Sequence, residues 1–316
     1  MSDNPAAIFD SPTELEHSIY SNFVREQLSL IHPVNSSTPS QLWHYTNADG
    51  LIGILQSGEL WSTHVSCLND QMELRYSRRL LLNKIIEVSN GIVSKEGMRF
   101  LELVKLRLAE DDTTTSEWFV TSFSTKMDDL SQWRAYGFGE GGYAIGFDFS
   151  KLNDRNKVDN ADIVPICYDI ETQSDIAKNV AQMTLRYFLQ GLSGKDRNFE
   201  TWSEKFLIEW GKHLTYLAPL IKHPKFFEEH EWRLVRQLRP NEHTKLTYRS
   251  KSTMIARHLP LKLSEPDKIL PITKIIVGPS RNKNVSRISV GDLLKSSLYP
   301  DGKVQVVESE VPFQNV

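Results

Sequence analysis

Two glutamates and an arginine alternate in the segment Glu229-His230-Glu231-Trp232-Arg233. On a β-strand, side chains alternate between two faces, so Glu229, Glu231 and Arg233 would share one face. Carboxylates beside an arginine can orient hydroxyl groups and stabilise a developing positive charge. The alternative is a solvated strand face on which the arginine neutralises the acids, because exposed charged strand faces are common.

A histidine stands among aromatic and hydroxyl side chains early in the chain, between Trp43 and Thr46. Their types predict a short strand over 42–46, with His44 and Thr46 on one face and Trp43 and Tyr45 on the other. His44 either contacts a ligand or is a hydrogen-bonded structural histidine.

A short amphipathic helix is predicted directly after this strand. Asn47 or Asp49 can cap its first turn, and Gly58 stands where a left-handed residue would end it. A second strand is expected over 59–65. The apolar residues that predict the buried stripe of the helix are Leu51, Ile52, Ile54 and Leu55.

Further polar candidates lie in the middle of the chain. The segment 117–124 alternates as a strand, and Ser122 and Ser124 share one of its faces. They either contact a ligand or line a polar sheet surface. Trp133 and Tyr136, in SQWRAYG, are expected to pack rather than to form a stacking platform.

Other catalytic motifs are weak or missing. Residues 137–142 match GxGxxG, but they lead into the strand-like YAIGFDF, whereas a dinucleotide fingerprint needs a helix there. The sequence contains no HExxH, CxxC, GxSxG or GxxxxGK[ST] pattern. We therefore predict a turn or ligand-facing loop at 137–142, free thiols at Cys67 and Cys167, and no metal site.

The surrounding pattern predicts an α+β protein. Residues 12–31 have helical periodicity and 32–41 read as a linker, so 1–40 form an N-terminal helix and linker and 41–316 one domain. Helical insertions are predicted at about 69–110, with a break near 89–91, and at 175–220. Strands are predicted over 143–149, 163–168, 227–238 and 274–277. Their irregular alternation with helices disfavours a doubly wound sheet.

Composition sets broad limits on the function. The chain has 316 residues, 40% of them hydrophobic and 24% charged, with a net charge of -3, which is ordinary for a globular protein. This charge gives no global reason for nucleic-acid binding, although a local basic patch stays open. The acidic N-terminus lacks a signal-peptide pattern and no apolar run is long enough to span a bilayer, so we predict a cytoplasmic protein without a membrane partner.

Separated segments of the chain resemble the bacterial DUF2971 family. They are, in order, HYTNADGLIGILQSGELW, SCLND, FVTSFS, LSQWRAYGFGEGGYAIGFD, EEHEWRLV, ITKIIVGPS and VVESEVPFQ. The first also resembles the start of the ADP-ribosyltransferase fold. That resemblance implies a split, strongly bent mixed α+β sheet with helical insertions, which binds NAD as a substrate in a cleft.

The resemblance implies a set of NAD-binding residues. His44 would hydrogen-bond a ribose hydroxyl, and Tyr45 or Thr46 would frame the nicotinamide. Ser122 and Ser124 would support the nicotinamide-binding strand and the glutamate. In branches that use a tyrosine as the middle landmark, Tyr136 or Tyr143 is the nearby candidate.

The resemblance also implies the catalytic residues. Glu231 would bind the ribose 2′-hydroxyl and stabilise an oxocarbenium-like transition state, and Glu229 would orient the acceptor or act as a base. The chain is thus expected to cleave NAD and to transfer ADP-ribose to a protein or nucleic acid, as a toxin or antiphage defence effector. The alternative is a non-catalytic interaction module in which Glu229, Glu231 and Arg233 form an ion-pair ladder.

Overall fold

The structure, a computed structural model, describes residues 27, 30–31, 38–68, 71–92, 94–109, 117–136, 141–158, 161–194, 197–251, 254–263 and 269–312. The predicted N-terminal helix and most of its linker lie outside these residues, although Gln27, Leu30 and Ile31 are helical. The chain divides into two compact units. One unit comprises 1–35, 68–116 and 167–224, and the other comprises 36–67, 117–166 and 225–316.

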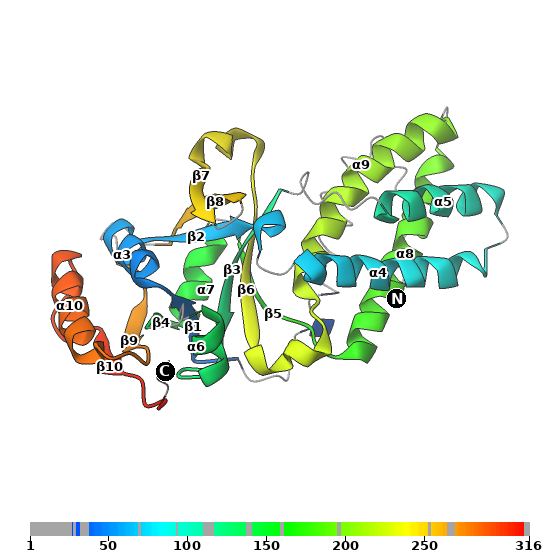
Figure 1. Ribbon diagram of the computed structural model, residues 1–316. Helices are drawn as coiled ribbons and strands as arrows, with labels where there is room; N and C mark the ends of the chain where they lie inside the picture. Colours follow the sequence, from blue (N-terminus) through cyan, green and yellow to red (C-terminus); the bar gives the residue numbers. More distant parts are fainter. Residues whose placement is uncertain are drawn as a thin grey trace, which may run out of the picture. The chain divides into compact units, whose positions relative to one another are not determined.

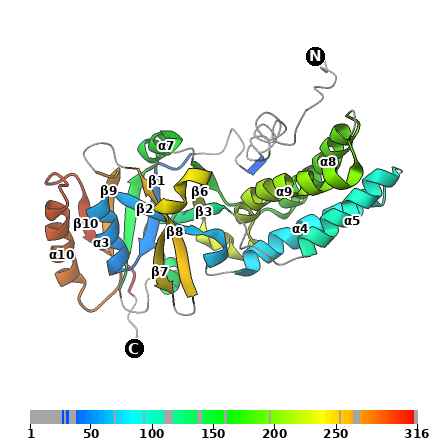
Figure 2. The ribbon, with the colours of Figure 1, turned by 90° about the horizontal axis from the view of Figure 1, so that it is seen from above.

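The first unit is helical. It contains α4 (Gln71–Ser89), α5 (Lys95–Ala109), α8 (Ile170–Leu192), α9 (Phe199–Leu217) and the 3₁₀ turn η3 (Ala218–Leu220). Helix α4 lies alongside both α5 and α8 (Figure 2). Phe100 stacks on Phe188 with 3.6 Å between ring centroids, and Phe206 meets both rings edge-on. The helical character predicted for 69–110 and 175–220 is confirmed, and each span contains two helices.

The second unit is built on a ten-stranded sheet (Figure 1). Its strands are β1 (Gln41–Thr46), β2 (Glu59–His64), β3 (Trp118–Ser124), β4 (Tyr143–Asp148), β5 (Asp162–Pro165), β6 (Glu231–Gln237), β7 (Thr247–Lys251), β8 (Met254–Lys262), β9 (Ile272–Val277) and β10 (Gln305–Glu308). The order is β10-β9-β4-β1-β3-β2-β8-β7, and β6 joins β5 to β3. The strand pairs are antiparallel except for β9 with β10. The predicted α+β class is confirmed.

Strand β3 has three neighbours, which divides the sheet. β6 pairs with β3 along its whole length, from Trp118 to Ser124. The opposite edge of β3 is shared, because β1 pairs at Ser124 and β2 pairs at Phe119 and Val120. β1 and β2 therefore separate along β3, and Ser122 lies at the division.

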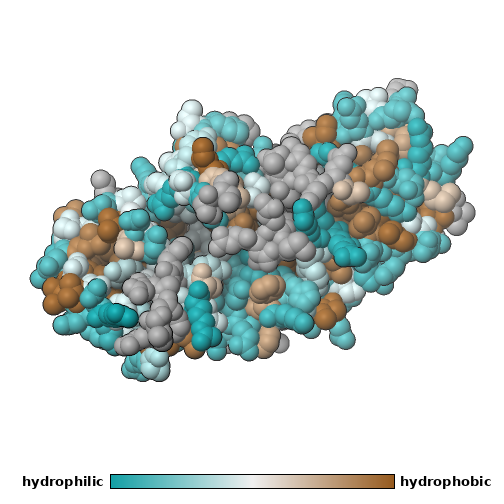
Figure 3. All heavy atoms as spheres, in the orientation of Figure 1, coloured by the Kyte–Doolittle hydropathy of each residue, from teal (hydrophilic) through white to brown (hydrophobic). Residues whose placement is uncertain are grey.

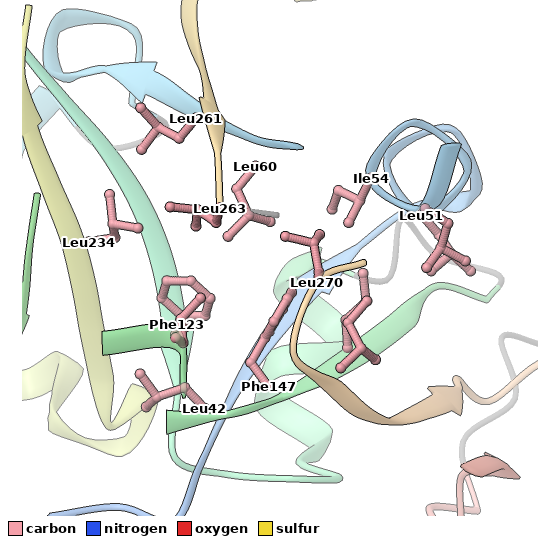
Figure 4. Packing of buried hydrophobic residues seen from close by; sticks show 14 of the residues in the cluster. Leu42, Leu51, Ile54, Leu60, Phe123, Phe147, Leu234, Leu261, Leu263 and Leu270 are labelled. Atoms are coloured by element: carbon pink, nitrogen blue, oxygen red, sulfur yellow. The ribbon is translucent and has the colours of Figure 1, made fainter. Parts of the chain in front are cut away.

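One face of the sheet, the core face, carries the main hydrophobic core. Leu42, Phe123 and Leu234 point from three strands into this core (Figure 4). Side chains from three helices complete it. The helices are α3 (Ala48–Ser57), α7 (Phe149–Val158) and α10 (Lys283–Ser296).

The opposite face, the second face, carries a smaller aromatic cluster under helix α6 (Leu130–Tyr136). Trp133 of α6 packs there against Trp43 and Tyr45 of β1. Gly146 on β4 is required below this cluster, because a Cβ atom at that position would lie 2.6 Å from the Trp43 ring. Side chains of β1 thus pack on both faces of the sheet, as their alternation predicts.

Helix α3 follows its sequence signals closely. The Asn47 side chain accepts a hydrogen bond of 2.8 Å from the Gly50 amide at the N-terminus, and Gly58 ends the helix with φ of 67°. Leu51, Ile54 and Leu55 are buried as predicted. The prediction for Ile52 is wrong, because this side chain is 40% exposed. It follows Leu51 by one residue, about 100° around the helix, and so leaves the buried stripe.

The predicted strand 227–238 is wrong at its beginning. Residues Pro224–Glu229 form the 3₁₀ turn η4, and β6 starts only at Glu231. His230 between them has φ of 46°, a left-handed conformation that few residues other than glycine adopt. The chain therefore changes direction between Glu229 and Glu231.

Exposed apolar side chains are scattered over both units, as at Leu106, Ile208 and Ile255. Figure 3 shows apolar residues interspersed with polar ones on the face in view. Among the helices that the structure describes, none has the length and apolar character needed to cross a membrane.

Candidate functional site

The pair Glu231 and Arg233 forms a buried ion pair at the start of β6. Arg233 Nε donates to Glu231 Oε1 at 2.7 Å, and a terminal guanidinium nitrogen donates to Oε2 at 3.0 Å. The two side chains are 5% and 3% exposed, respectively. The expectation that they share a strand face is confirmed, but the alternative of a solvated face is wrong. Two charge-assisted hydrogen bonds offset the burial of both charges.

Glu229 does not continue this row of charges. It ends the 3₁₀ turn η4, and left-handed His230 separates it from the strand. The prediction that Glu229, Glu231 and Arg233 alternate along one strand is therefore wrong for Glu229. The strand itself thus carries Glu231 and Arg233 of the predicted row, and Glu229 lies in the adjoining turn.

Ser124 fixes the turn that precedes Glu231. Its hydroxyl donates to the Glu229 carbonyl oxygen at 2.7 Å and accepts from the Lys126 amide at 3.1 Å. In the strand register Ser124 lies directly opposite Glu231, so both side chains project from the second face of the sheet. Ser124 thus supports the backbone of the glutamate segment.

Ser122 lies on the same face, opposite Arg233 in the register. Its carbonyl oxygen points to the divided edge of β3 and lies 2.9 Å from Nδ1 of His44. Because a carbonyl oxygen only accepts, Nδ1 carries the proton, and the Nε2 atom of the neutral ring is an acceptor. Burial lowers the pKa of His44, and the hydrogen bond to Ser122 partly opposes this shift.

The structure brings the three predicted segments together but not all of their side chains. Trp43 pairs with Ser124, so alternation sends the His44 side chain to the core face, where it meets the Phe123 ring at 5.9 Å. The Glu231 side chain projects from the opposite face, the second face. The expectation that His44 and Glu231 line the same cleft is therefore not met by this register.

The remaining predicted site residues of β1, Tyr45 and Thr46, make contacts within the fold. Tyr45 donates to the Lys126 carbonyl oxygen at 2.9 Å, accepts from the Asp129 amide at 3.3 Å and packs edge-on against Trp133 at 4.8 Å. Burial raises the pKa of Tyr45. Thr46 leads into α3, and its Oγ1 lies 2.0 Å from where a Cβ at position 50 would stand, so only glycine fits there.

The aromatic residues of α6 pack, as the sequence predicts. Trp133 is buried, and its indole nitrogen donates to Asp128 at 2.6 Å. Tyr136 is partly buried against the cluster of Trp43 and Trp133. This places Tyr136 on the second face, which is also the face of Glu231.

A basic and aromatic group on the second face was not identified from motifs. Trp61 and Thr63 on β2 lie beside Arg249, Lys251 and His258 on β7 and β8. The signal in the sequence is a run from 243 to 264 that has five Lys and Arg residues and no Asp or Glu. Residues far apart in the chain complete this group, which a local motif search does not detect.

Within the described ranges no three His, Cys, Asp or Glu side chains gather in a way that could hold a metal ion. Cys67 and Cys167 are buried free thiols, as predicted. Burial raises the pKa of the Cys167 thiol to about 11, so it is protonated and unreactive at neutral pH.

Comparison with curated proteins and with solved structures found no match to the chain. A comparison with protein families found one match. The matched range includes most of α6, Glu231 and Arg233 but not His44, Ser122 or Ser124. Over residues 132–234 the chain matches DUF2971, a family described as proteins of unknown function, and the DUF2971 resemblance read from the sequence is thereby confirmed.

Proposed function

We propose that the chain cleaves NAD in the cytoplasm and transfers ADP-ribose to a protein or nucleic-acid acceptor, with Glu231 as the catalytic carboxylate. One observation supports this proposal best. The segments around His44, Ser122 and Glu231, far apart in sequence, meet where β1 and β2 separate along β3. A split sheet is what the resemblance to ADP-ribosyltransferases implies.

Glu231 is suited to stabilise a cation. In the proposed reaction the bond between ribose C1 and the nicotinamide nitrogen breaks, and nicotinamide leaves with the bonding electrons. Positive charge develops on the ribose, and a fixed buried carboxylate stabilises that charge more than the ground state. Arg233 donates to both carboxylate oxygens and so fixes the orientation of Glu231.

The other residues take revised roles in this proposal. Ser124 holds the turn before Glu231. Glu229, which lies in that turn, accepts a proton from the acceptor while the acceptor attacks the ribose. His44 is a positioning residue, because its side chain bonds to the backbone of Ser122 rather than lying on the face of Glu231. An enzyme with this activity would consume NAD or modify host molecules, which suits a toxin or antiphage effector.

A second function, a non-catalytic interaction module, is favoured by the bidentate pair itself. Both carboxylate oxygens of Glu231 are hydrogen-bonded to Arg233, and each side chain is at most 5% exposed. A pair of this kind can serve the fold alone. The sheet would then present a binding surface for a partner protein.

Nicotinamide release separates the two functions. The purified chain is incubated with NAD, and nicotinamide is measured by chromatography beside transfer of labelled ADP-ribose to proteins and nucleic acids of a bacterial lysate. Glu231→Gln should lower the rate by at least about 100-fold. Glu228→Gln, at an exposed position of η4, is the matched control and should keep the rate. Absence of both turnover and NAD binding in the unmodified chain would favour the module.

A further inference from the structure

The β7–β8 hairpin carries a positive charge that its own segment does not balance. Between His243 and Ser264 there are five Lys and Arg residues and no Asp or Glu, although the whole chain has a net charge of -3. His258 pairs with Thr63 on one side and with Thr247 on the other, so these three side chains share the second face. Arg249 and Lys251 follow Thr247 at alternate positions and lie on the same face. We call Thr63, Arg249, Lys251 and His258 the hairpin cluster.

Contacts from β2 and the turn after it hold these side chains in place. The Arg249 guanidinium lies 3.9 Å above the centroid of the Trp61 ring. Lys251 Nζ donates to the Cys67 carbonyl oxygen at 2.7 Å, and His258 Nδ1 lies 3.3 Å from the Thr63 hydroxyl. Lys251 keeps two N–H groups for a ligand. One terminal nitrogen of the stacked Arg249 guanidinium lies against Gly53 of α3.

Among the residues that the structure describes, no carboxylate pairs with either cation, Arg249 or Lys251. Asp49 of α3 raises the pKa of Arg249 by its charge but does not come within ion-pair distance. The hairpin cluster thus combines an exposed arginine and a partly buried lysine with a histidine and a hydroxyl.

The pKa shifts of the cluster agree with this imbalance. Burial lowers the pKa of both Arg249 and Lys251. Burial, and then the charges of Arg249 and Lys251, lower the pKa of His258 to about 4. Burial disfavours each charged form, and a bound anion would oppose that effect.

We propose that the hairpin cluster binds a phosphate group, carried either by a dinucleotide such as NAD or by a nucleic-acid strand. Arginine and lysine are the usual partners of phosphate, and a threonine hydroxyl adds a neutral donor. The cluster lies on the face of Ser122 and Glu231. Glu231 lies on β6, at the other edge of β3, and β7, which carries Arg249 and Lys251, is four strand spacings from β6, or roughly 20 Å along the sheet.

This inference concerns binding and is tested without turnover. Two probes are used, ADP-ribose by calorimetry and a fluorescein-labelled single-stranded oligonucleotide by anisotropy, each at low ionic strength with inorganic phosphate as competitor. The variant Arg249→Gln/Lys251→Gln removes two charges from the cluster. Lys245→Gln/Lys262→Gln removes two charges from the same segment outside it and serves as the matched control.

The cluster variant should weaken binding by at least about tenfold, since each lost charge-assisted hydrogen bond counts for roughly that factor. The control should change binding by no more than about threefold. Arg249→Lys/Lys251→Arg, which keeps both charges, should restore most of the affinity. A loss confined to ADP-ribose assigns the phosphate to a dinucleotide, and a loss confined to the oligonucleotide assigns it to a nucleic acid.

Two results would overturn the phosphate site. One is that the unmodified chain binds neither probe at millimolar ADP-ribose and micromolar oligonucleotide. The other is that the cluster and control variants weaken binding equally. Because Glu231→Gln leaves the hairpin cluster intact, it should still bind ADP-ribose or the oligonucleotide, so failure of the catalytic proposal is distinguishable from failure of this one.

Discussion

The Nδ1–H group of His44 donates a hydrogen bond of 2.9 Å to the carbonyl oxygen of Ser122, at the point where β1 and β2 separate along β3. On a continuous sheet a peptide N–H of the neighbouring strand would occupy that position. The imidazole replaces it, and its ring also meets Phe123 of the core face at 5.9 Å. His44 therefore closes the division in the sheet, which makes it a structural residue for the strand that carries Ser122.

Replacement of His44 by alanine should destabilise the fold. The substitution removes the partner of the Ser122 carbonyl oxygen and leaves space beside Phe123, so we expect the free energy of unfolding to fall by about 1–3 kcal/mol. Urea denaturation followed by circular dichroism measures the change. His243→Ala, at an exposed position, is the control and should stay within about 0.5 kcal/mol. Equal effects of the two substitutions would argue against a bond that supports the sheet.

Stability should fall as the pH drops below 6.5. The pKa of His44 and of His258 is lowered in the folded chain from the ordinary 6.5, that of His258 to about 4. Below pH 6.5 the unfolded chain therefore binds more protons than the folded one. The stability that neutral His258 contributes is fully present above pH 6.5 and is lost between pH 6.5 and about 4. Urea denaturation at pH 7.5, 6 and 5 should give a smaller decrease for His258→Gln than for the unmodified chain, and parallel decreases would contradict the assignment.

Ser124 and Ser122 offer a matched pair of hydroxyl deletions. The Ser124 hydroxyl bonds both the Glu229 carbonyl oxygen and the Lys126 amide, whereas no hydrogen bond of the Ser122 hydroxyl is found among the described residues. Ser124→Ala should lower the free energy of unfolding by about 1–2 kcal/mol, and Ser122→Ala by less than about 0.5 kcal/mol. Thermal unfolding of both variants tests this order. A larger effect at Ser122 would show that the turn before Glu231 does not depend on Ser124.

The sequence predicts correctly those features that are determined by residues close together in the chain. Asn47 and Gly58 bound α3 as expected, and the alternation of β1 sends Leu42 and Trp43 to opposite faces. Ile52 was assigned wrongly because an apolar residue type does not by itself give the direction of a helix face. The predicted start of β6 is wrong because the left-handed conformation of His230 carries no local signal. The Thr125 amide donates to the His230 carbonyl oxygen and holds that conformation.

Long-range register decided the rest of the site. Sequence order suggested that His44, Ser122 and Glu231 meet, and their segments do, but a single pairing of Trp43 with Ser124 determines that His44 faces the core. A shift of one residue would reverse that result, and nothing in the residue types of β1 fixes it. The hairpin cluster was missed for a related reason, since its members come from three strands.

The pairing of Glu231 with Arg233 should appear as a strong coupling energy. Removing one partner leaves the other charge buried without compensation, so Glu231→Leu and Arg233→Met should each lower the free energy of unfolding by about 3–5 kcal/mol. The double variant buries no charge at these positions. Its loss should therefore be clearly smaller than the sum of the two single losses.

Guanidinium denaturation of the four proteins gives this coupling energy, and nicotinamide release from the folded variants adds a second reading. If Glu231 is catalytic, the double variant regains stability without regaining turnover, because an apolar side chain cannot stabilise a ribosyl cation. If the pair serves the fold alone, no variant in the set changes a catalytic rate. Additive losses of stability would contradict the buried pair, since partners that interact through two charge-assisted hydrogen bonds cannot be removed independently.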